Sequence, residues 1–393
     1  SLLVEPIKAD LGLSDTQIGL LLGAAFVVFY SIANIPAGYL VDRFNRRTIV
    51  GVSCLCWSSI TAASGFAQSF FQLFVGRAGV GLAESTISPA AFSLIRDQIP
   101  AAKRGRAFSI LAAGPFIGSA LSLMVGGAIL AMAAHGTFSQ VPVLNTLSGW
   151  QIVLLLVGLA GLPLALLALL LTETRVAAPS REPTIGFRVA FEYMWRRRGV
   201  YGLLIAYATA CGMLAFGKSA WIPAMFGRNF GLAPAEVGPA LGLINLTVAP
   251  IGVILGGFVI DRFAKIGRDI RLYGVFAAVM AAIGMVALPL MPDVRSAWLM
   301  FALQAAFAGT FYAVGATTLA EITPERLMGR VTAAYLLLQN VIGQALGPLI
   351  IALLADGWFK DHGRFAIGHA ISMVGGIVGC ISVVAVILLI RRL

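Results

Sequence analysis

The feature that most limits how this chain can fold is a series of uninterrupted apolar runs. About 20 apolar residues in helical conformation cross the hydrocarbon core of a bilayer, whereas a membrane β-strand is shorter and alternates polar with apolar residues. The runs here are continuous, so they favour helices. We predict eleven complete spans, near residues 16–41, 48–67, 70–95, 107–134, 150–172, 199–224, 236–260, 271–291, 296–321, 331–355 and 368–390.

The composition supports an integral, multi-pass membrane protein. The chain is 59% hydrophobic and only 11% charged, whereas soluble domains carry roughly 25% charged residues. We place it in the inner (plasma) membrane of a bacterium. The fragment 1–7 is apolar but too short to span, and the polar segment 8–15 follows it. We therefore expect the chain to begin near the end of a further helix, giving twelve spans with the first largely absent.

The net charge of +11 is compatible with nucleic-acid binding, but the placement of the charges argues against it. Of the 28 Lys and Arg residues, 21 fall in one set of alternate loops and the C-terminal tail, and five fall in the other set. Cytoplasmic loops are enriched in Lys and Arg, so the first set is predicted to be cytoplasmic. The charge thus reports topology and contact with the lipid bilayer; no nucleic-acid partner is expected.

The longest predicted cytoplasmic connection divides the chain in two. It runs over 173–198, contains Pro179 and Pro183, and ends in an amphipathic stretch, 185–195, that suits a helix lying on the membrane surface. We predict an N-terminal transmembrane bundle at 1–172, a cytoplasmic linker with an amphipathic helix at 173–198, and a C-terminal transmembrane bundle at 199–393.

The two halves contain matching motifs. Gly38–Phe44 (GYLVDRF) matches Gly257–Phe263 (GFVIDRF) at an offset of 219 residues, and Pro100–Arg106 matches Pro324–Arg330 at an offset of 224. Two independent pairs at nearly one offset indicate an internal repeat. Repeats of this kind are typical of transporters whose substrate site lies between the two halves.

The strongest motif is Gly38–Arg47, in a tight cytoplasmic turn between two spans. It resembles the G-x-x-x-D-R-x-x-R-R signature of the major facilitator superfamily. We interpret it as a cytoplasmic gate: Gly38 lets helices approach closely, and Asp42 faces a helix N-terminus and a basic side chain such as Arg96. The alternative is that these charges only end helices and set topology. The predicted gate residues are Gly38, Asp42, Arg43, Arg46, Arg47, Arg96, Asp261 and Arg262.

This resemblance implies an all-α membrane fold, the twelve-span major facilitator fold. Its two six-helix bundles are related by a pseudo-two-fold axis. It also implies secondary active transport by alternating access, in which a substrate site is exposed in turn to the two sides of the membrane.

The predicted fourth helix carries polar residues on one stripe. Arg77, Gly81, Glu84 and Ser88 recur at three- and four-residue spacing, and positions seven apart drift only about 20° on an ideal helix. Glu84 lies near the middle of the span. A carboxylate there costs at least ~2.5–3.5 kcal/mol on insertion scales, so it must face a cavity, pair with a base or be protonated.

We hypothesise that Glu84, with Arg77, carries proton coupling. A change of partner would switch Glu84 between its charged and neutral forms. Arg77 is alternatively a site for an anionic headgroup, because guanidinium suits phosphate and carboxylate. A structural Arg–Glu pair that never changes partner is the third possibility.

Lys218 is the other cation inside a span. It lines a substrate cavity or extends to the outer headgroups. Buried amides and hydroxyls either line the same cavity or join helices. The predicted cavity residues are Arg77, Glu84, Ser88, Asn34, Tyr207, Lys218, Gln304, Thr310 and Asn340.

Within the superfamily, two segments resemble the Spinster branch. They are Gly76–Pro100, with Gly76-Arg77, Gly81, Glu84, Pro89 and Arg96-Asp97, and Ser1–Gly19, with Ser14-Asp15 and Gln17. That resemblance implies transport of lysolipids or sphingoid lipids, such as sphingosine-1-phosphate. Members of the branch also place an Asp-Arg pair in the first helix, which this sequence lacks. An organic-anion, sugar-acid or drug transporter of the same superfamily is the alternative.

Other classes have little support in the sequence. There is no P-loop, and the three histidines lack metal-ligand spacing, so neither a cofactor, a metal site nor an enzyme is expected. The four cysteines lie in apolar runs and are interpreted as small packing residues. We expect a monomeric carrier that binds a small-molecule substrate and protons. A non-transporting membrane receptor on the same fold is the remaining alternative.

Overall fold

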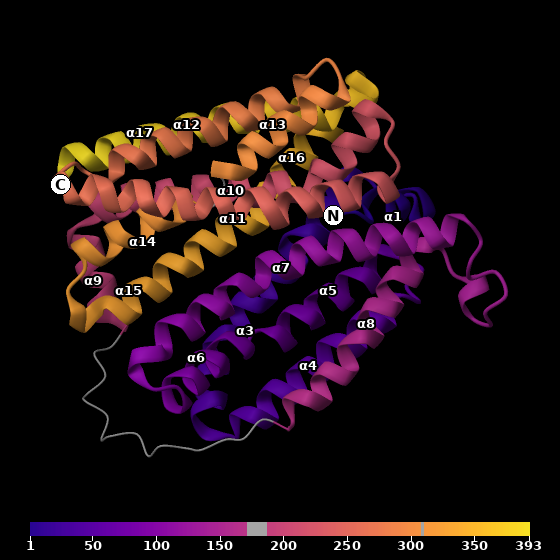
Figure 1. The fold of residues 1–393 in the computed structure, drawn as a ribbon, viewed down its shortest axis with the longest axis horizontal. Coiled ribbons are helices and arrows are strands. Elements are labelled where there is room, and N and C mark those ends of the chain that lie inside the picture. Colours follow the sequence, from indigo (N-terminus) through magenta and orange to yellow (C-terminus); the bar gives the residue numbers. More distant parts are fainter. Residues whose placement is uncertain (171–186, 308–309) are drawn as a thin grey trace. The chain divides into compact units, whose positions relative to one another are not determined.

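The structure, a computed structural model, describes residues 1–170, 187–307 and 310–393. A few further side chains, including those of Asp42 and Thr310, lie outside the described residues. Within the described residues the regular secondary structure is entirely helical (Figure 1). This is what a bilayer requires, because an α-helix satisfies its backbone hydrogen bonds within one segment. The predicted all-α fold class is confirmed.

The helices form two compact units. The N-terminal unit contains the first eight α-helices and the short segment Ala233–Gly242. Its helices are α1 (Val4–Leu11), α2 (Asp15–Leu22), α3 (Ala24–Arg43), α4 (Arg46–Ser64), α5 (Phe70–Glu84), α6 (Ile87–Gln98), α7 (Ala101–Ala134), η1 (Leu144–Thr146) and α8 (Gly149–Ala168).

The C-terminal unit contains the remaining helices, except for the start of α11. They are α9 (Phe187–Arg196), α10 (Arg198–Phe230), α11 (Pro234–Lys265), α12 (Arg271–Ala287), η2 (Leu288–Leu290), α13 (Val294–Phe307), α14 (Thr310–Ile322), α15 (Glu325–Leu338), η3 (Gln339–Leu346), α16 (Gly347–Asp356), η4 (Lys360–Phe365) and α17 (Ala366–Arg392). The predicted boundaries 1–172, 173–198 and 199–393 stay a prediction, since 171–186 lie outside the described residues.

Nine helical segments of the described chain are long and apolar enough to cross a membrane. They correspond to nine of the eleven predicted spans. The other two are also helical. The span predicted at 48–67 is α4, whose first turn carries Arg46 and Arg47, and the one predicted at 296–321 is represented by α13 and α14 on either side of residues 308–309.

Small residues set the close helix contacts of both units. A Cβ added at Gly158 of α8 would lie 2.3 Å from the backbone nitrogen of Ala62 in α4. In the C-terminal unit, Gly212 of α10 meets Gly343 of η3, where an added Cβ would lie 3.0–3.3 Å from the other glycine's Cα. Glycines at such contacts let helices approach to backbone distance, which strengthens packing where no water drives helices together.

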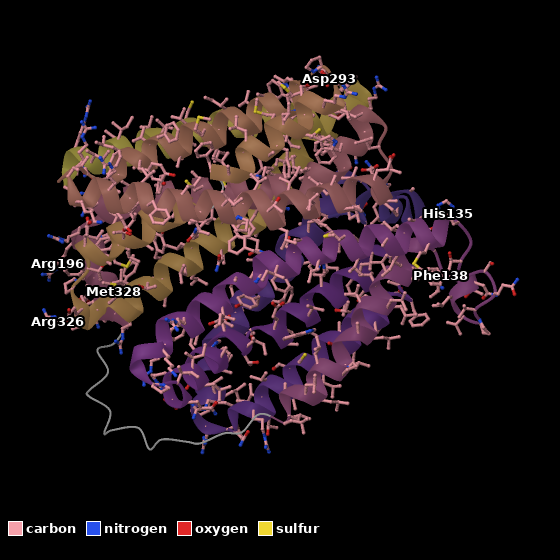
Figure 2. The ribbon with its side chains drawn as sticks, in the orientation of Figure 1. His135, Phe138, Arg196, Asp293, Arg326 and Met328 are labelled. Carbon is pink, nitrogen blue, oxygen red and sulfur yellow. The ribbon has the colours of Figure 1, made fainter. Side chains whose placement is uncertain are left out.

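Charged residues mark the two ends of the C-terminal unit. Figure 2 shows Asp293, before α13, at one end and Arg196 and Arg326 at the other. Arg196 ends α9, which lies in the sequence region predicted to form a surface helix. This arrangement agrees with the alternation of basic and non-basic loops along the chain.

The first helix is anchored to the start of α8. The carboxylate of Asp10 accepts hydrogen bonds of 2.7 Å from the Ser148 hydroxyl and from the Trp150 indole N–H. The bond from Ser148, and next that from Trp150, holds the pKa of Asp10 below its ordinary 3.8. Lys8 and Asp15 form an ion pair of 2.5 Å nearby. These contacts fix residues 4–15 to the N-terminal unit.

We predict that Asp10→Ala destabilises the protein by about 1–3 kcal/mol, because the buried indole N–H of Trp150 loses its acceptor. A carboxyl group whose pKa is lowered by folding stabilises above its unfolded-state pKa, and this stabilisation disappears as pH falls through the folded-state pKa. The deficit in thermal stability in detergent should therefore be constant between about pH 5 and pH 8. Asp361→Ala, at an exposed position, is the control. A deficit that vanishes between pH 7 and pH 5 would contradict the assignment.

Candidate functional site

The span predicted at residues 70–95, the fourth in the twelve-span count, is broken in its middle, between α5 and α6. Glu84 is the last residue of α5, Ser85 and Thr86 form the break, and α6 begins at Ile87. Pro89 explains the position of the break. Proline has no backbone N–H, so the carbonyl four residues earlier, that of Ser85, has no helical donor.

Side chains from neighbouring helices satisfy the polar groups of the break. The amide of Asn34 in α3 donates to the Ser85 carbonyl at 3.4 Å. The Ser85 hydroxyl donates to the Leu82 carbonyl at 2.8 Å, and the hydroxyls of Ser53 and Thr86 lie 2.6 Å apart. Hydrogen bonds from α3 and α4 therefore stabilise the break between α5 and α6.

Two glycines allow α5 to pack closely against α3 and α4. A Cβ added at Gly81 would lie 2.5 Å from the Phe26 carbonyl oxygen of α3, and one at Gly79 would lie 3.2 Å from Ile60 of α4. The glycine of the predicted polar stripe thus serves helix packing. Its contact with α3 fixes the rotation of α5 and so the directions in which the side chains of its last two turns project.

Arg77 and Glu84 stand on this positioned helix. Glu84 is the central residue of the span Phe70–Gln98 and is half-buried, whereas Arg77 is exposed. Seven residues of α-helix separate them by about 10.5 Å along the axis. A guanidinium that protein does not cover is costly in hydrocarbon, so a wet or ligand-filled space beside Arg77 is favoured over lipid.

Ser88 and Tyr30 extend this polar surface beyond the break. The Tyr30 and Ser88 hydroxyls lie 3.5 Å apart, and Ser88 is exposed. The predicted site residues Asn34, Glu84 and Ser88 are therefore brought together around the α5–α6 break, with Arg77 two turns away. Together they offer a carboxylate, a guanidinium, hydroxyls and an interrupted helix, which is chemistry for holding a proton or an anion.

The predicted site residues of the C-terminal unit are mostly buried. Lys218 of α10 is only 7% exposed, and its ammonium lies 5.4 Å from the centre of the Phe301 ring of α13. This burial rules out the alternative that Lys218 extends to the outer headgroups. Contact with a ligand stays a prediction.

Gln304, Tyr207 and Asn340 differ in their surroundings. The Gln304 amide donates to the Ala281 carbonyl of α12 at 3.2 Å, while its buried side-chain oxygen has no partner among the described residues. Tyr207 of α10 is 1% exposed and lies in a buried hydrophobic cluster with Cys211 and Tyr273. Asn340 is half-buried in η3, a π-helix, and the Thr310 side chain lies outside the described residues. Gln304 thus joins α12 and α13, which is the second of the two roles predicted for buried amides.

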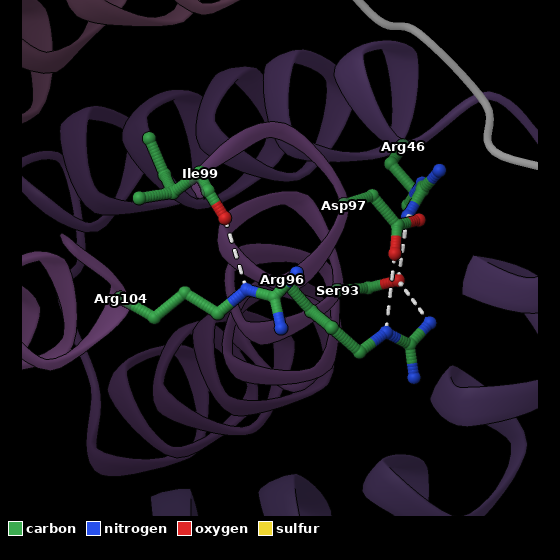
Figure 3. A network of polar contacts seen from close by, with 6 residues as sticks. All are labelled: Arg46, Ser93, Arg96, Asp97, Ile99 and Arg104. Carbon is green, nitrogen blue, oxygen red and sulfur yellow. Dashed lines mark hydrogen bonds and ion pairs between the residues drawn. The ribbon is translucent and has the colours of Figure 1, made fainter. Parts of the chain in front are cut away.

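The end of the N-terminal unit that carries the predicted gate motif holds a buried ion pair (Figure 3). Arg46, the first residue of α4 and 3% exposed, lies 2.5 Å from the Asp97 carboxylate of α6 and donates to the Ser93 hydroxyl at 2.6 Å. Arg96 pairs with the other oxygen of Asp97 at 3.1 Å. The pair connects two helices at the end of the predicted gate motif.

An equivalent pair occupies the C-terminal unit. Arg271, the first residue of α12, lies 2.8 Å from the Glu321 carboxylate near the end of α14. Glu321 follows Asp97 by 224 residues, and Arg271 follows Arg46 by 225. The repeat therefore extends from the sequence motif to a shared ion pair. Arg271 has a second partner, Asp269, at 2.8 Å.

Two details of the predicted gate differ in the structure. Gly38 makes no close helix contact among the described residues, since an added Cβ would have no heavy atom within 4 Å. The prediction that it serves helix packing is wrong here, because Gly38 borders a cavity. The predicted contact of Asp42 falls on a side chain outside the described residues, while the acid bonded to Arg96 is Asp97.

The other predicted gate residues have diverse roles. Arg43 hydrogen-bonds the Tyr39 hydroxyl one turn earlier, and Arg47 is half-buried. Asp261 and Arg262 are exposed at the end of α11. Sequence reasoning passed over Asp97, Ser93 and Ser53. The repeat offset that pairs Asp97 with Glu321 would have found the first of them.

The chain matches the family model of the Major Facilitator Superfamily over residues 1–348. The chain belongs to the major facilitator superfamily. It is therefore a multi-pass membrane transporter of small molecules, and the predicted superfamily is confirmed. The sequence is 26% identical to an MFS-type efflux pump of Mycolicibacterium smegmatis, covering 95% of this chain and 84% of the pump. It is 27% identical to the cis,cis-muconate transport protein of Acinetobacter baylyi, covering 95% and 86%.

The predicted likeness to Spinster appears in both kinds of comparison. A crystal structure of a bacterial homologue of the human lysosomal transporter Spinster, inward-facing and unoccupied, has a TM-score of 0.82 at 23% identity, covering 99% of this chain and 91% of that one. The sphingosine-1-phosphate transporter SPNS2 of Mus musculus is 31% identical over 38% of this chain and 28% of its own length. The structural likeness establishes the fold.

We predict that Asn34→Leu lowers the free energy of unfolding by about 1–2 kcal/mol, because the Ser85 carbonyl loses its donor. In a Pro89→Ala background the same change should cost little, since an alanine in place of the proline supplies the missing helical N–H. Thermal unfolding of the four proteins in detergent measures this coupling. An equal cost of Asn34→Leu in both backgrounds would contradict the proposed origin of the break.

The two equivalent ion pairs predict unequal costs. Asp97→Asn should destabilise by about 3–5 kcal/mol, because it removes the carboxylate from buried Arg46. Glu321→Gln should cost less than about 1 kcal/mol, because the Glu321 side chain is 48% exposed and exposed pairs contribute little. Thermal unfolding of each variant is the measurement, and each serves as control for the other. Equal costs would show that burial does not set the strength of these pairs.

Proposed function

We propose that this protein is a proton-coupled carrier of an anionic or amphipathic small molecule, working by alternating access in the inner membrane of a bacterium. The observation that carries the proposal is the placement of Glu84. It is a carboxyl group at the centre of a membrane span, at the end of a helix that Pro89 interrupts. A group in this position changes its proton occupancy when its surroundings change between wet and dry.

Arg77 supplies the anion-binding part of the proposal. It is exposed within its own unit and shares the helix of Glu84. A guanidinium binds phosphate or carboxylate through two parallel hydrogen bonds. When the anion is bound, its charge replaces that of Glu84 near Arg77, so substrate and proton compete for the same electrostatic environment. Competition of this kind couples two fluxes.

The named substrates of two relatives support an anion. They are cis,cis-muconate and sphingosine-1-phosphate. A lysolipid or sphingoid phosphate and a small organic acid share this charged group and differ in their apolar part. We favour the shared chemistry, with a lipid chain as the finer proposal and an organic or sugar acid as the alternative.

Release of the cytoplasmic ion pairs belongs to the same proposal. Arg46–Asp97 and Arg271–Glu321 each tie the first turn of one helix to the end of another. Rearrangement of helix ends on one side accompanies exposure of the site to that side. In this proposal the carrier needs one copy of the chain, with bundles at 1–172 and 199–393.

The experiment uses proteoliposomes and a probe panel of dicarboxylates, sugar acids and lysophospholipids. The probe bound most tightly by the purified protein is then tested for accumulation driven by an imposed pH gradient. Glu84→Gln should reduce gradient-driven accumulation at least about tenfold while leaving counterflow without a gradient, because exchange needs substrate binding but no proton release. Glu192→Gln, at an exposed position of α9, is the charge-matched control.

Two results would contradict the proposal. Undiminished gradient-driven accumulation by Glu84→Gln would remove the proton role. Binding restricted to neutral probes and unaffected by Arg77→Ala would remove the anion role. Ligand binding without counterflow by the unaltered protein would indicate a receptor on a transporter fold.

A further inference from the structure

A cavity of about 550 Å³ lies at the cytoplasmic end of the N-terminal unit, away from Glu84. It is bordered by α3, α6 and α7. Its lining combines the apolar residues Val41, Pro89, Phe92 and Phe108 with two cations, Arg96 and Arg104. Cavities of roughly 300–1,000 Å³ are the size that holds small ligands.

The charged side of the cavity has more cations than anions. Arg46, Arg96 and Arg104 lie together in this region (Figure 3), and Asp97 is the acid bonded to the first two. Among the described residues, no acidic side chain borders the cavity itself. A cationic surplus therefore remains, and the positive N-terminal end of α7, only three residues before Arg104, adds to it.

Neither cavity arginine is fully committed to protein partners. Arg96 binds Asp97 through its Nε and donates weakly, at 3.5 Å, to the Ser93 hydroxyl through one terminal nitrogen. Its side chain is 66% exposed. Arg104 donates its Nε to the Ile99 carbonyl at 2.9 Å, which orients the guanidinium, and among the described residues no bond of its two terminal nitrogens is seen. Two oriented guanidinium groups are a strong recognition element for phosphate.

The apolar side has a shape that suits a hydrocarbon chain. The Phe92 and Phe108 rings lie 5.5 Å apart at an angle of 50°. Phe92 is 53% exposed although it is a large apolar residue. Gly38 borders the cavity without any side chain, which leaves room beside Val41.

We infer that this cavity binds the phosphate headgroup of an amphiphile, with Arg96 and Arg104 on the phosphate and Phe92 and Phe108 against the start of the chain. The site is separate from Arg77 and Glu84, and the inference does not depend on the direction of transport or on proton coupling. Two sources have this chemistry: a single-chain lysophosphatidate offered as substrate, and a two-chain phospholipid of the cytoplasmic leaflet.

The experiment measures lipid binding to the full chain in phosphatidylcholine nanodiscs by native mass spectrometry. The probes are oleoyl lysophosphatidate, phosphatidylglycerol and inorganic phosphate. Arg96→Gln, alone and with Arg104→Gln, should weaken lysophosphatidate binding at least about tenfold, as expected for loss of charge-assisted hydrogen bonds. Phe92→Gln should reduce the preference for oleoyl over a short-chain analogue.

Matched controls separate this site from general positive charge. Lys103→Gln and Arg106→Gln remove the same charge from exposed neighbours that do not border the cavity, and binding should change less than about twofold because such charges act only through screened water. In an Arg77→Ala background, Arg96→Gln should still weaken lysophosphatidate binding at least about tenfold, so that failure here and failure of the transport proposal are distinguishable.

Each outcome is decisive. Arginine-dependent binding that is tighter for lysophosphatidate assigns the site to a carried substrate, and binding that is tighter for phosphatidylglycerol assigns it to a bilayer lipid; both support the inference. Equal loss in the control variants would overturn it, as would inorganic phosphate binding as well as the lipids. Unchanged binding by Arg96→Gln, whose exposed side chain makes misfolding unimportant, would overturn it too.

Discussion

The hydrogen bond from Asn34 to the Ser85 carbonyl illustrates the constraint on which the rest of this structure depends. In a bilayer, backbone polar groups have no water to bind, so each must find a partner within the protein. Pro89 removes one partner in the middle of a span, and α3 supplies another. Because Asn34 replaces the missing donor, α5 can end in the middle of the span, and its last residue, Glu84, lies there.

The same constraint explains why charge is placed so sparingly. Away from the helix ends, the polar residues around the break are mostly neutral hydroxyls and amides, which α3, α4 and α6 can satisfy for one another. Glu84 and Arg77 are the ionisable exceptions on this helix, and Gly81 between them lets α5 pack directly on the α3 backbone. The packing contact and the charged side chains are thus set by one helix rotation.

Charge at the helix ends follows a different rule. Arg46–Asp97 and Arg271–Glu321 occupy equivalent positions in the two halves, yet the first is buried and the second is half-exposed. Internal duplication conserves the pairing geometry, whereas the surroundings of each copy set its strength. Beside the first pair, Arg96 and Arg104 add charge to a cavity.

The sequence by itself determined the class of fold, the alternation of basic loops and the repeat, and it singled out Arg77 and Glu84 as candidates. These features depend on local composition and on periodicity along one helix. Tertiary structure decided which groups meet. Asp97 is bonded to Arg96, Gly38 borders a cavity, and Lys218 lies against Phe301. Such contacts join residues far apart in the chain. Which of several chemically similar residues meet depends on how whole helices pack, and a local sequence pattern does not contain that information.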